Sequence, residues 1–377
     1  MAGPVRHPID IKALERYLEQ NVPEIKTPIE LKQFGFGQSN PTYQITTPVN
    51  GQKYVLRKKP PGKLLSAAAH KVEREARVLS ALGPTDVTVP EVYCLCEDST
   101  VIGTPFYIMS FLDGRIIEDA AMPEVSSPEE RLALWKAAVE TLAKLHRVDY
   151  KAIGLEKFGK SGGFYQRQIA TWNGICSAQE KARDVDTGKE VGPLPKMEEL
   201  MGFFSKKDRR PKDRTTIVHG DYKIDNLVFH KTEPRVIGIL DWEMSTIGHP
   251  LSDLSNLTTQ FFTCRRHASV QNAHAGFLPG RTPGLPSLDQ IYSWYSAAAG
   301  WSHTAEELAW GMAFNVFRLA AVCQGIAARV ARRQASSDEA KKHAETKGPL
   351  AEFAWDLAVE STEKKKKKKK KGGKAKL

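Results

Sequence analysis

Two periodicities of apolar and polar residues divide the chain near residue 112. Up to that point, short apolar runs bounded by turn residues such as Asn50-Gly51 are typical of strands. We expect these strands at Ile29–Phe34, Thr42–Thr46, Lys53–Arg57, Glu91–Cys96 and Pro105–Phe111. Apolar residues at helical spacing predict one helix over residues 8–22 and another over Ser66–Leu82, which Gly83-Pro84 ends.

Beyond Leu112-Asp113-Gly114 the pattern is mainly helical. Ser127-Pro128-Glu129-Glu130 has the signature of a capping box with proline at the first helical position, so a helix begins there. Residues 156–214 are polar and rich in Gly, Pro and Lys, and we expect a long irregular segment on the substrate side. Gly276–Pro286 is predicted to be a loop. Further helices are predicted at Leu251–Phe262, Leu288–Ala299, Ala305–Arg333 and Leu350–Glu360.

This order of elements predicts an α+β fold of two lobes. Residues 1–112 would form a small antiparallel-sheet N-lobe, and residues 113–355 a larger, mainly helical C-lobe. Residues 356–377 would be a disordered, lysine-rich tail. A sheet lobe with one helix, a hinge and then a helical lobe is the protein-kinase-like architecture.

Composition excludes several classes of protein. With 41% apolar residues and no run of about twenty of them, the chain is not expected to have a transmembrane segment. Met1–Asp10 lacks the apolar core of a signal peptide. Five cysteines, few and odd in number, predict free thiols in a reducing compartment.

The net charge of +11 comes from one end of the chain. Ten lysines lie within residues 364–377, and without them the 55 basic residues fall to 45 against 44 acidic ones. The folded part is therefore nearly neutral, so we expect no nucleic-acid-binding domain. The lysine block can instead attract an anionic membrane surface.

One motif combines the groups that phosphoryl transfer requires. His219, Asp221, Lys223 and Asn226 have the spacing H-x-D-x-K-x-x-N, and Asp241 ends an apolar run about fifteen residues further on. Asp221 is the candidate catalytic carboxylate that orients the attacking hydroxyl, and Lys223 the cation on the moving phosphate. Asn226 and Asp241 are the candidate Mg²⁺ ligands. As alternatives, the acids and the amide are turn or strand-end residues, and Lys223 is a solvated lysine.

Three nearby polar residues are assigned other roles. We expect His219 to be structural, with a hydrogen bond to a backbone carbonyl, rather than to act as a base. Asp253 is predicted to be a buried acid that ties down the catalytic loop, and Asp225 a solvent-facing loop acid.

The strand-rich part holds the candidate nucleotide contacts. Glycines let backbone N–H groups approach phosphates, and a neighbouring hydroxyl or amide adds a donor. A plain hairpin is the alternative for this loop. Its candidate residues are Gly35, Gly37, Gln38, Ser39 and Asn40.

A cation on the following strand should meet the α- and β-phosphates. Alternation puts Arg57 and Lys58 on opposite faces, so only one of them can do so. Glu73 or Glu75 on the next helix would pair with it, and we name Glu75 as the candidate. On the connecting strand, Met109 and Phe111 are the candidate adenine contacts.

These residues resemble a known family. His219-Gly220-Asp221, Asn226 and Leu240-Asp241-Trp242-Glu243 are similar to motifs of the aminoglycoside phosphotransferase / choline kinase-like family. Phe36–Tyr43, Tyr54–Lys63 and Ile102–Met109 look like the kinase-like domain at the N-terminus of certain acyl-CoA dehydrogenases. The similarity covers residues from about 28 to about 355.

The resemblance implies ATP and Mg²⁺ as cofactors and a small-molecule hydroxyl as acceptor. That branch points to a hydroxy fatty acyl group, as a CoA thioester or a free hydroxy acid, whose product would feed β-oxidation. Since no dehydrogenase half accompanies these residues, we expect a stand-alone kinase. The position that resembles the family's nucleotide-binding lysine is Arg57, whose fork geometry differs from that of lysine.

A C-terminal signal predicts the location. Ala375, Lys376 and Leu377 resemble a conservative variant of the Ser-Lys-Leu peroxisomal address, so we expect an import receptor as partner and a peroxisomal rather than cytoplasmic protein.

Three alternatives remain at this stage. One is a kinase of an amino sugar or a choline-like alcohol, although the lysine-rich residues 156–214 suit anionic CoA phosphates better than a cationic acceptor. Another is a catalytically inactive, kinase-like binding or scaffold protein, against which Asp221, Asn226 and Asp241 argue. The third is nucleic-acid binding through the tail.

Overall fold

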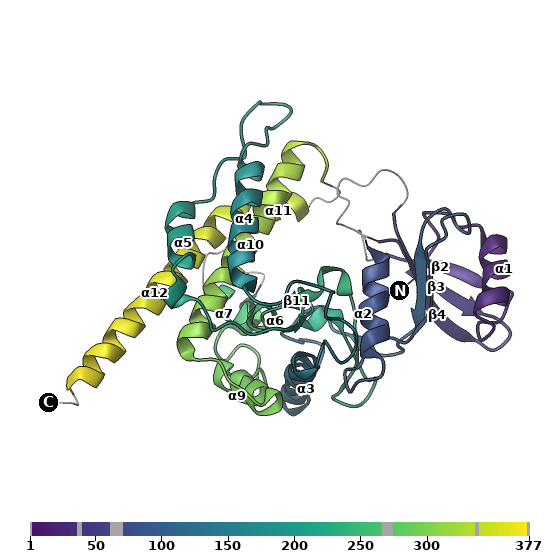
Figure 1. Ribbon diagram of the computed structural model, residues 1–377, viewed down its shortest axis with the longest axis horizontal. Helices are drawn as coiled ribbons and strands as arrows, with labels where there is room; N and C mark the ends of the chain where they lie inside the picture. The colour runs from purple at the N-terminus through teal and green to yellow at the C-terminus, as the bar shows by residue number, and fades with distance from the viewer. Residues whose placement is uncertain (1, 36–39, 61–70, 266–273, 336–338, 375–377) are drawn as a thin grey trace. The chain divides into compact units, whose positions relative to one another are not determined.

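A computed structural model describes residues 2–35, 40–60, 71–265, 274–335 and 339–374 (Figure 1). The chain divides into two compact units, each made of three segments. Unit 1 comprises Met1–Glu118, Val148–Lys157 and His219–Thr246, and unit 2 comprises Asp119–Arg147, Phe158–Val218 and Ile247–Leu377. The predicted boundary at residues 112 and 113 therefore falls within unit 1, which also contains the whole H-x-D motif.

Unit 1 is built on a six-stranded sheet of order β1-β2-β3-β4-β6-β5, in which neighbouring strands are antiparallel. The five predicted strands are present as β2 to β6, and the two-residue β1 was not predicted. The strands are β1 (Ala2–Gly3), β2 (Glu30–Phe34), β3 (Thr42–Thr47), β4 (Gln52–Lys58), β5 (Val92–Cys96) and β6 (Phe106–Ser110).

The two faces of this sheet are covered by different helices. Helix α1 (Ile11–Asn21) buries Leu14 and Leu18 against one face, in a core that includes Tyr43, Leu56 and Phe106. Helix α2 (Val72–Leu82) packs on the opposite face, so the sheet lies between the two helices in Figure 1. This second face is the one that presents Arg57.

Helix α2 is shorter than predicted. The pattern predicts a start at Ser66, but Lys71 has a non-helical backbone and the helix begins at Val72, the first residue it buries. Residues 66–70 lie outside the described part. Its end at Gly83 is as predicted.

A smaller sheet carries the motif within unit 1. Strands β7 (Arg115–Ile116), β9 (Leu227–Phe229) and β10 (Val236–Ile239) pair antiparallel in the order β10-β9-β7. The 3₁₀ turns η2 (Ile224–Asn226) and η3 (Trp242–Met244) flank the β9–β10 hairpin. The motif residues thus come from the two ends of one hairpin.

Unit 2 is mainly helical, and the long buried helix α10 is central to it. Helix α12 packs along α10, and α4 and α6 also contact it. A short pair, β8 and β11, leads into and out of the motif segment. The elements are α3 (Pro128–Arg147), α4 (Phe164–Glu180), α5 (Met197–Phe204), η1 (Lys207–Arg209), β8 (Thr216–Val218), β11 (Thr246–Gly248), α6 (Leu251–Leu257), α7 (Gln260–Thr263), η4 (Ala275–Phe277), α9 (Leu288–Ala299), α10 (Ala305–Ala331), α11 (Glu339–Glu345) and α12 (Lys347–Lys374).

The prediction of a long irregular segment over residues 156–214 is wrong. Helices α4 and α5 form within it. Over its seventeen residues α4 buries only Phe164, Tyr165, Ile169 and Cys176, which is too sparse a set to show a helical period in the sequence. Packing against α10 therefore stabilises a helix that its own pattern does not predict.

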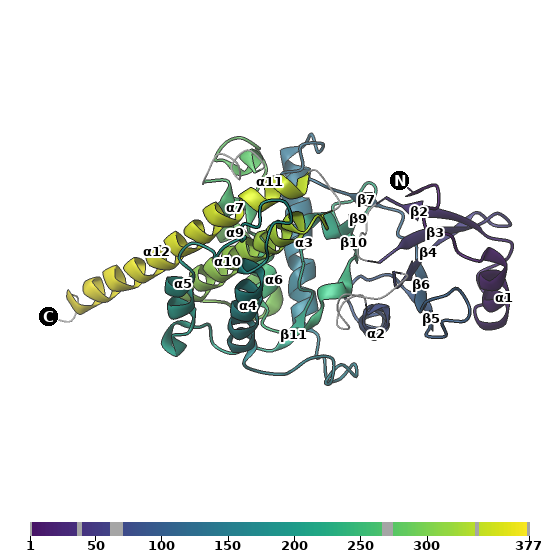
Figure 2. The same ribbon diagram turned by 90° about the horizontal axis from the view of Figure 1, so that it is seen from above.

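The predicted disorder from residue 356 also differs from the structure, in which α12 continues to Lys374 (Figure 2). The helix is already formed where Leu350, Ala351, Ala354 and Ala358 are buried. Lysine is a good helix former, and extending a helix needs no new nucleus. Ala375, Lys376 and Leu377 lie outside the described residues, so the peroxisomal address stays a prediction.

Helix α10 is long and apolar enough to cross a membrane by length and composition alone. However, 67% of its most apolar window is buried inside the protein, which is typical of a core helix. Its side chains pack against the other helices of unit 2.

Candidate active site

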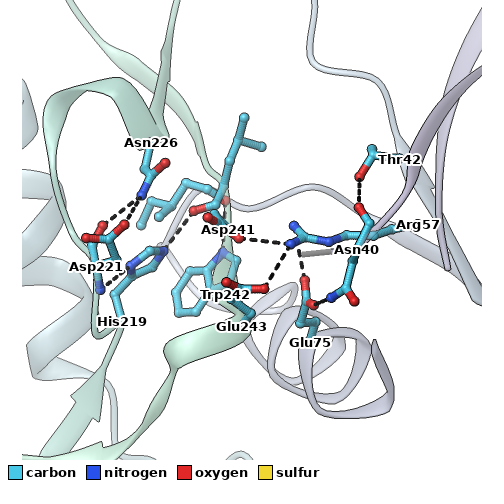
Figure 3. A network of polar contacts seen from close by, with 12 residues as sticks. Asn40, Thr42, Arg57, Glu75, His219, Asp221, Asn226, Asp241, Trp242 and Glu243 are labelled. Atoms are coloured by element: carbon cyan, nitrogen blue, oxygen red, sulfur yellow. Dashed lines mark hydrogen bonds and ion pairs between the residues drawn. The ribbon is translucent and has the colours of Figure 1, made fainter. Parts of the chain in front are cut away.

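His219 ties the motif loop to the end of β10 (Figure 3). Its ring is fully buried, and Nε2 lies 2.8 Å from the carbonyl oxygen of Leu240 while Nδ1 accepts the backbone N–H of Asp221 at 3.2 Å. A carbonyl oxygen can only accept, so Nε2 carries the proton. Trp242 packs edge-on against the ring, with centroids 4.8 Å apart. Both ring nitrogens are thus engaged with the backbone, the arrangement expected of a structural histidine.

Gly220 allows the loop to turn sharply between His219 and Asp221. Its φ is +90°, and a Cβ placed there would lie 2.5 Å from the carbonyl oxygen of Met244. A side chain at this position would therefore meet both backbone strain and a steric clash.

The structure brings Asp221, Asn226 and Lys223 together. The Asn226 amide nitrogen donates to the backbone oxygen of Asp221 at 2.8 Å and to its carboxylate at 3.2 Å. Lys223 Nζ lies 3.6 Å from the Asp221 carboxylate and 2.9 Å from that of Asp225. Asp225, predicted to face solvent, is half-exposed and holds Lys223.

Asp241 follows β10 in a left-handed backbone conformation, with φ 63° and ψ 62°. Such a conformation is uncommon outside glycine and is tolerated best by Asp and Asn. Here it starts the turn η3, and the Asp241 carboxylate meets Arg57 from β4 at 2.9 Å. Asn226 and Asp241 supply amide and carboxylate oxygens, which suit Mg²⁺.

The sequence left open whether Arg57 or Lys58 is the cation of the site, and whether Glu75 or Glu73 is its partner. Packing of α2 on one face of the sheet decides both. Arg57 faces α2 and pairs with Glu75 at 3.3 Å, whereas Glu73 pairs with Lys59. Lys58 is buried on the other face, where the pKa of its ammonium is lowered by burial. Arg57 and Glu75 are therefore the ion pair of the site.

Glu75 is held by three donors from different elements. The Asn40 amide donates to it at 2.9 Å, the Tyr107 hydroxyl at 3.2 Å, and Arg57 forms the ion pair. Asn40 is fully buried here, so its amide holds Glu75 beside the candidate nucleotide loop.

The charges in this cluster perturb one another. Burial raises the pKa of Glu75 to about 7, against the opposing effect of Arg57, and the nearby Asp241 and Glu243 raise it further. Burial alone would lower the pKa of Arg57, but Glu75, Tyr107 and Asp241 raise it above its ordinary value. The guanidinium is therefore the permanent positive charge of the cluster.

The other predicted residues lie elsewhere or are not described. Gly35 follows β2, whereas Gly37, Gln38 and Ser39 lie outside the described residues. Met109 is buried in β6 opposite Val55, and the Phe111 ring lies under Lys53. Asp253 belongs to unit 2, where it is fully buried 3.3 Å from His146.

Sequence reasoning missed two residues of the site. Glu243 lies 3.5 Å from Arg57, and Tyr107 is the cross-strand partner of Arg57 as well as a donor to Glu75. Strand alternation on β6 places Tyr107 on the same face as Met109, so the pattern could have indicated that Tyr107 lies near the site. Glu243 is only two residues after Asp241, but the turn that brings both to Arg57 has no pattern of its own.

Comparisons with known proteins identify the family and the fold. The family model described as "Phosphotransferase enzyme family" matches residues 30–289. A solved putative aminoglycoside phosphotransferase from Ralstonia eutropha JMP134 is 38% identical, with a TM-score of 0.79 over 94% of this chain and 99% of that one. Plasmodium vivax ethanolamine kinase, 16% identical with a TM-score of 0.53 over 92% of this chain and 85% of that one, shares the fold. The predicted protein-kinase-like fold is confirmed.

Curated relatives of this chain are named as acyl-CoA dehydrogenases. "Acyl-CoA dehydrogenase family member 11" of Gallus gallus is 38% identical over 94% of this chain and 44% of its own length. "Probable acyl-CoA dehydrogenase IBR3" of Arabidopsis thaliana is 40% identical over 88% of this chain and 40% of its own length. The chain thus spans less than half the length of these relatives.

Proposed function

Because this chain belongs to the phosphotransferase enzyme family, we propose that it transfers the γ-phosphoryl group of ATP to a hydroxyl group of a small molecule. The observation that carries the proposal is the arrangement of Asp221, Asn226 and Asp241 in one unit with the buried Arg57–Glu75 pair. A carboxylate, oxygen ligands for a metal and a fixed cation are the parts that phosphoryl transfer uses.

Each residue has a defined part in this reaction. Asp221 accepts a hydrogen bond from the acceptor hydroxyl and aims its oxygen at the γ-phosphorus. The new O–P bond forms as the bond to the β-phosphate oxygen breaks, and the hydroxyl proton passes to Asp221. Asn226 and Asp241 would hold Mg²⁺, which offsets the phosphate charges. Lys223, kept close by Asp225, offers its ammonium to the moving phosphoryl group.

The proposed acceptor is a hydroxy fatty acyl group, as a CoA thioester or a free hydroxy acid. The support is that this chain matches part of relatives named acyl-CoA dehydrogenases. Phosphorylation turns hydroxide, a poor leaving group, into phosphate, a good one. A second enzyme can then eliminate phosphate and pass the unsaturated product to β-oxidation.

The test is ATP-dependent phosphorylation of hydroxyacyl-CoAs, free hydroxy acids and amino alcohols, read by mass spectrometry. Asp221→Asn is the inactive comparison, because it keeps the shape of the side chain and removes the carboxylate. Asp113→Asn, at an exposed ion pair with Lys231, is the matched control.

We expect a hydroxyacyl product that is heavier by one phosphoryl group with the wild type and Asp113→Asn. The rate of Asp221→Asn should be at least about 10³-fold lower, while the variant still binds ATP. An active Asp221→Asn protein would refute the catalytic role of this residue. Phosphorylation of amino alcohols alone would replace the proposed acceptor with a choline-like one.

A further inference from the structure

The guanidinium of Arg57 is shared between carboxylates on two sides (Figure 3). Its Nη1 lies 3.3 Å from Glu75, and its Nη2 lies 2.9 Å from Asp241 and 3.5 Å from Glu243. Only 10% of the side chain is exposed. Its Nε is buried and has no hydrogen-bond partner among the residues that the structure describes.

Asp241 and Glu243 thus converge on a single nitrogen. The left-handed backbone at Asp241 and the turn that follows bring two carboxylates, two residues apart, to one cationic group. Two carboxylates that face one point are also an arrangement that can bind a divalent cation through oxygen ligands. In the structure, the guanidinium of Arg57 lies at that point.

We propose that Asp241 and Glu243 form one cation site, which Arg57 fills until a divalent metal displaces its Nη2. This inference rests on the proposed function, and it makes Glu243 a second carboxylate of the metal site. Glu75 keeps Nη1 throughout, so Arg57 stays in place when it releases Asp241.

The displacement has a consequence for nucleotide binding. Nε and Nη2 lie on the same edge of a guanidinium, the edge that binds one oxyanion through two parallel hydrogen bonds. Once Nη2 is released, this edge can take a phosphate of the nucleotide, because within the described part of the chain nothing accepts a hydrogen bond from Nε. A lysine ammonium can also donate to a carboxylate and a phosphate, but it lacks the flat edge through which a guanidinium holds one oxyanion with two parallel hydrogen bonds. Metal binding therefore prepares Arg57 to bind phosphate.

The test is titration of the protein with Mn²⁺, without nucleotide, followed by electron paramagnetic resonance. The main variant is R57M/E75Q, which removes the cation together with its buried partner, so that no buried charge is left unpaired. R57K keeps the positive charge, in case the double variant does not fold. K231M, which removes the cation of an exposed ion pair, is the matched control.

We expect R57M/E75Q to bind Mn²⁺ about 10- to 100-fold more tightly than the wild type, since the metal no longer competes with a charged hydrogen bond. Adding E243Q to R57M/E75Q should remove most of this gain, and K231M should bind like the wild type. R57K should lower the affinity for MgATP, because the two-donor edge is lost.

Unchanged or weaker Mn²⁺ binding by R57M/E75Q would overturn the inference, as would a gain that survives E243Q. Should R57M/E75Q not fold, an R57K protein that keeps the MgATP affinity of the wild type would overturn it equally. A wild type that does not bind MgATP would contradict the proposed function instead. The Mn²⁺ comparison uses no nucleotide and decides the inference separately.

Discussion

Glu75 shows how one buried carboxyl group can link stability to pH. It is 1% exposed, and its environment raises its pKa to about 7 from the ordinary 4.5. A raised folded-state pKa means that the folded protein holds this proton more tightly than the unfolded chain does. The contribution to stability is therefore complete below about pH 4.5 and is lost as the pH rises through about 7. Arg57, Tyr107, Asp241 and Glu243 are the groups that act on it.

We expect the unfolding free energy of the wild type to fall between pH 5 and pH 8 by on the order of 1–3 kcal/mol more than that of Glu75→Gln. Urea denaturation at several pH values measures this difference. Glu73→Gln, in the more exposed pair with Lys59, is the control and should follow the wild type. Parallel curves for the wild type and Glu75→Gln would show that Glu75 does not titrate in this range.

Lys223 and Asp225 allow a second prediction for single residues. The carboxylates of Asp221 and Asp225 overcome the effect of burial and raise the pKa of Lys223, so its ammonium stays charged. Lys223→Met should lower kcat about 10²-fold, and Asp225→Asn, which frees Lys223 from its nearer partner, several-fold. MgATP affinity should change little in either variant. A normal kcat for Lys223→Met would mean that Lys223 is a surface lysine with no part in the reaction.

Among the elements, the motif loop depends on close backbone approach. Gly220→Ala should cost at least about 2 kcal/mol of stability, from the left-handed backbone and the clash with Met244. Gly51→Ala is the matched control, because Gly51 also has a positive φ, of 69°, but none of the described residues lies within 4 Å of a new Cβ there. Thermal unfolding should show a smaller loss for Gly51→Ala. Equal losses would mean that backbone strain alone accounts for the effect.

Elements were predictable where their residues share one environment. The bounds of β2 to β6 agree with the predicted ones to within one residue at each end and those of helix α9 agree fully, whereas β1 was not predicted. Helix α4 and the two-residue strand β7 have too few buried residues to show a period, because contacts from distant segments stabilise them.

For the molecule as a whole, α12 combines a packed part and a charged part. Truncation after Glu363 removes ten lysines and leaves in place every α12 residue that the structure describes as buried, so the melting temperature should change by no more than about 2 °C. Truncation after Thr346 also removes Leu350, Phe353 and Ala354, which pack with α10, and unit 2 should no longer unfold cooperatively. Calorimetry of both truncated proteins tests this. A large loss in the first would mean that the lysine-rich turns contribute to folding.

The sequence by itself determined which residues of the motif lie together. His219, Asp221, Asn226 and Asp241 lie in or directly beside one hairpin, so local spacing is enough to bring them together. The tertiary structure alone decided that Arg57 rather than Lys58, and Glu75 rather than Glu73, form the ion pair. It also brought Tyr107 and Glu243 to them. The physical reason is that alternation assigns residues to faces, whereas packing against α2 decides which face encloses a charge.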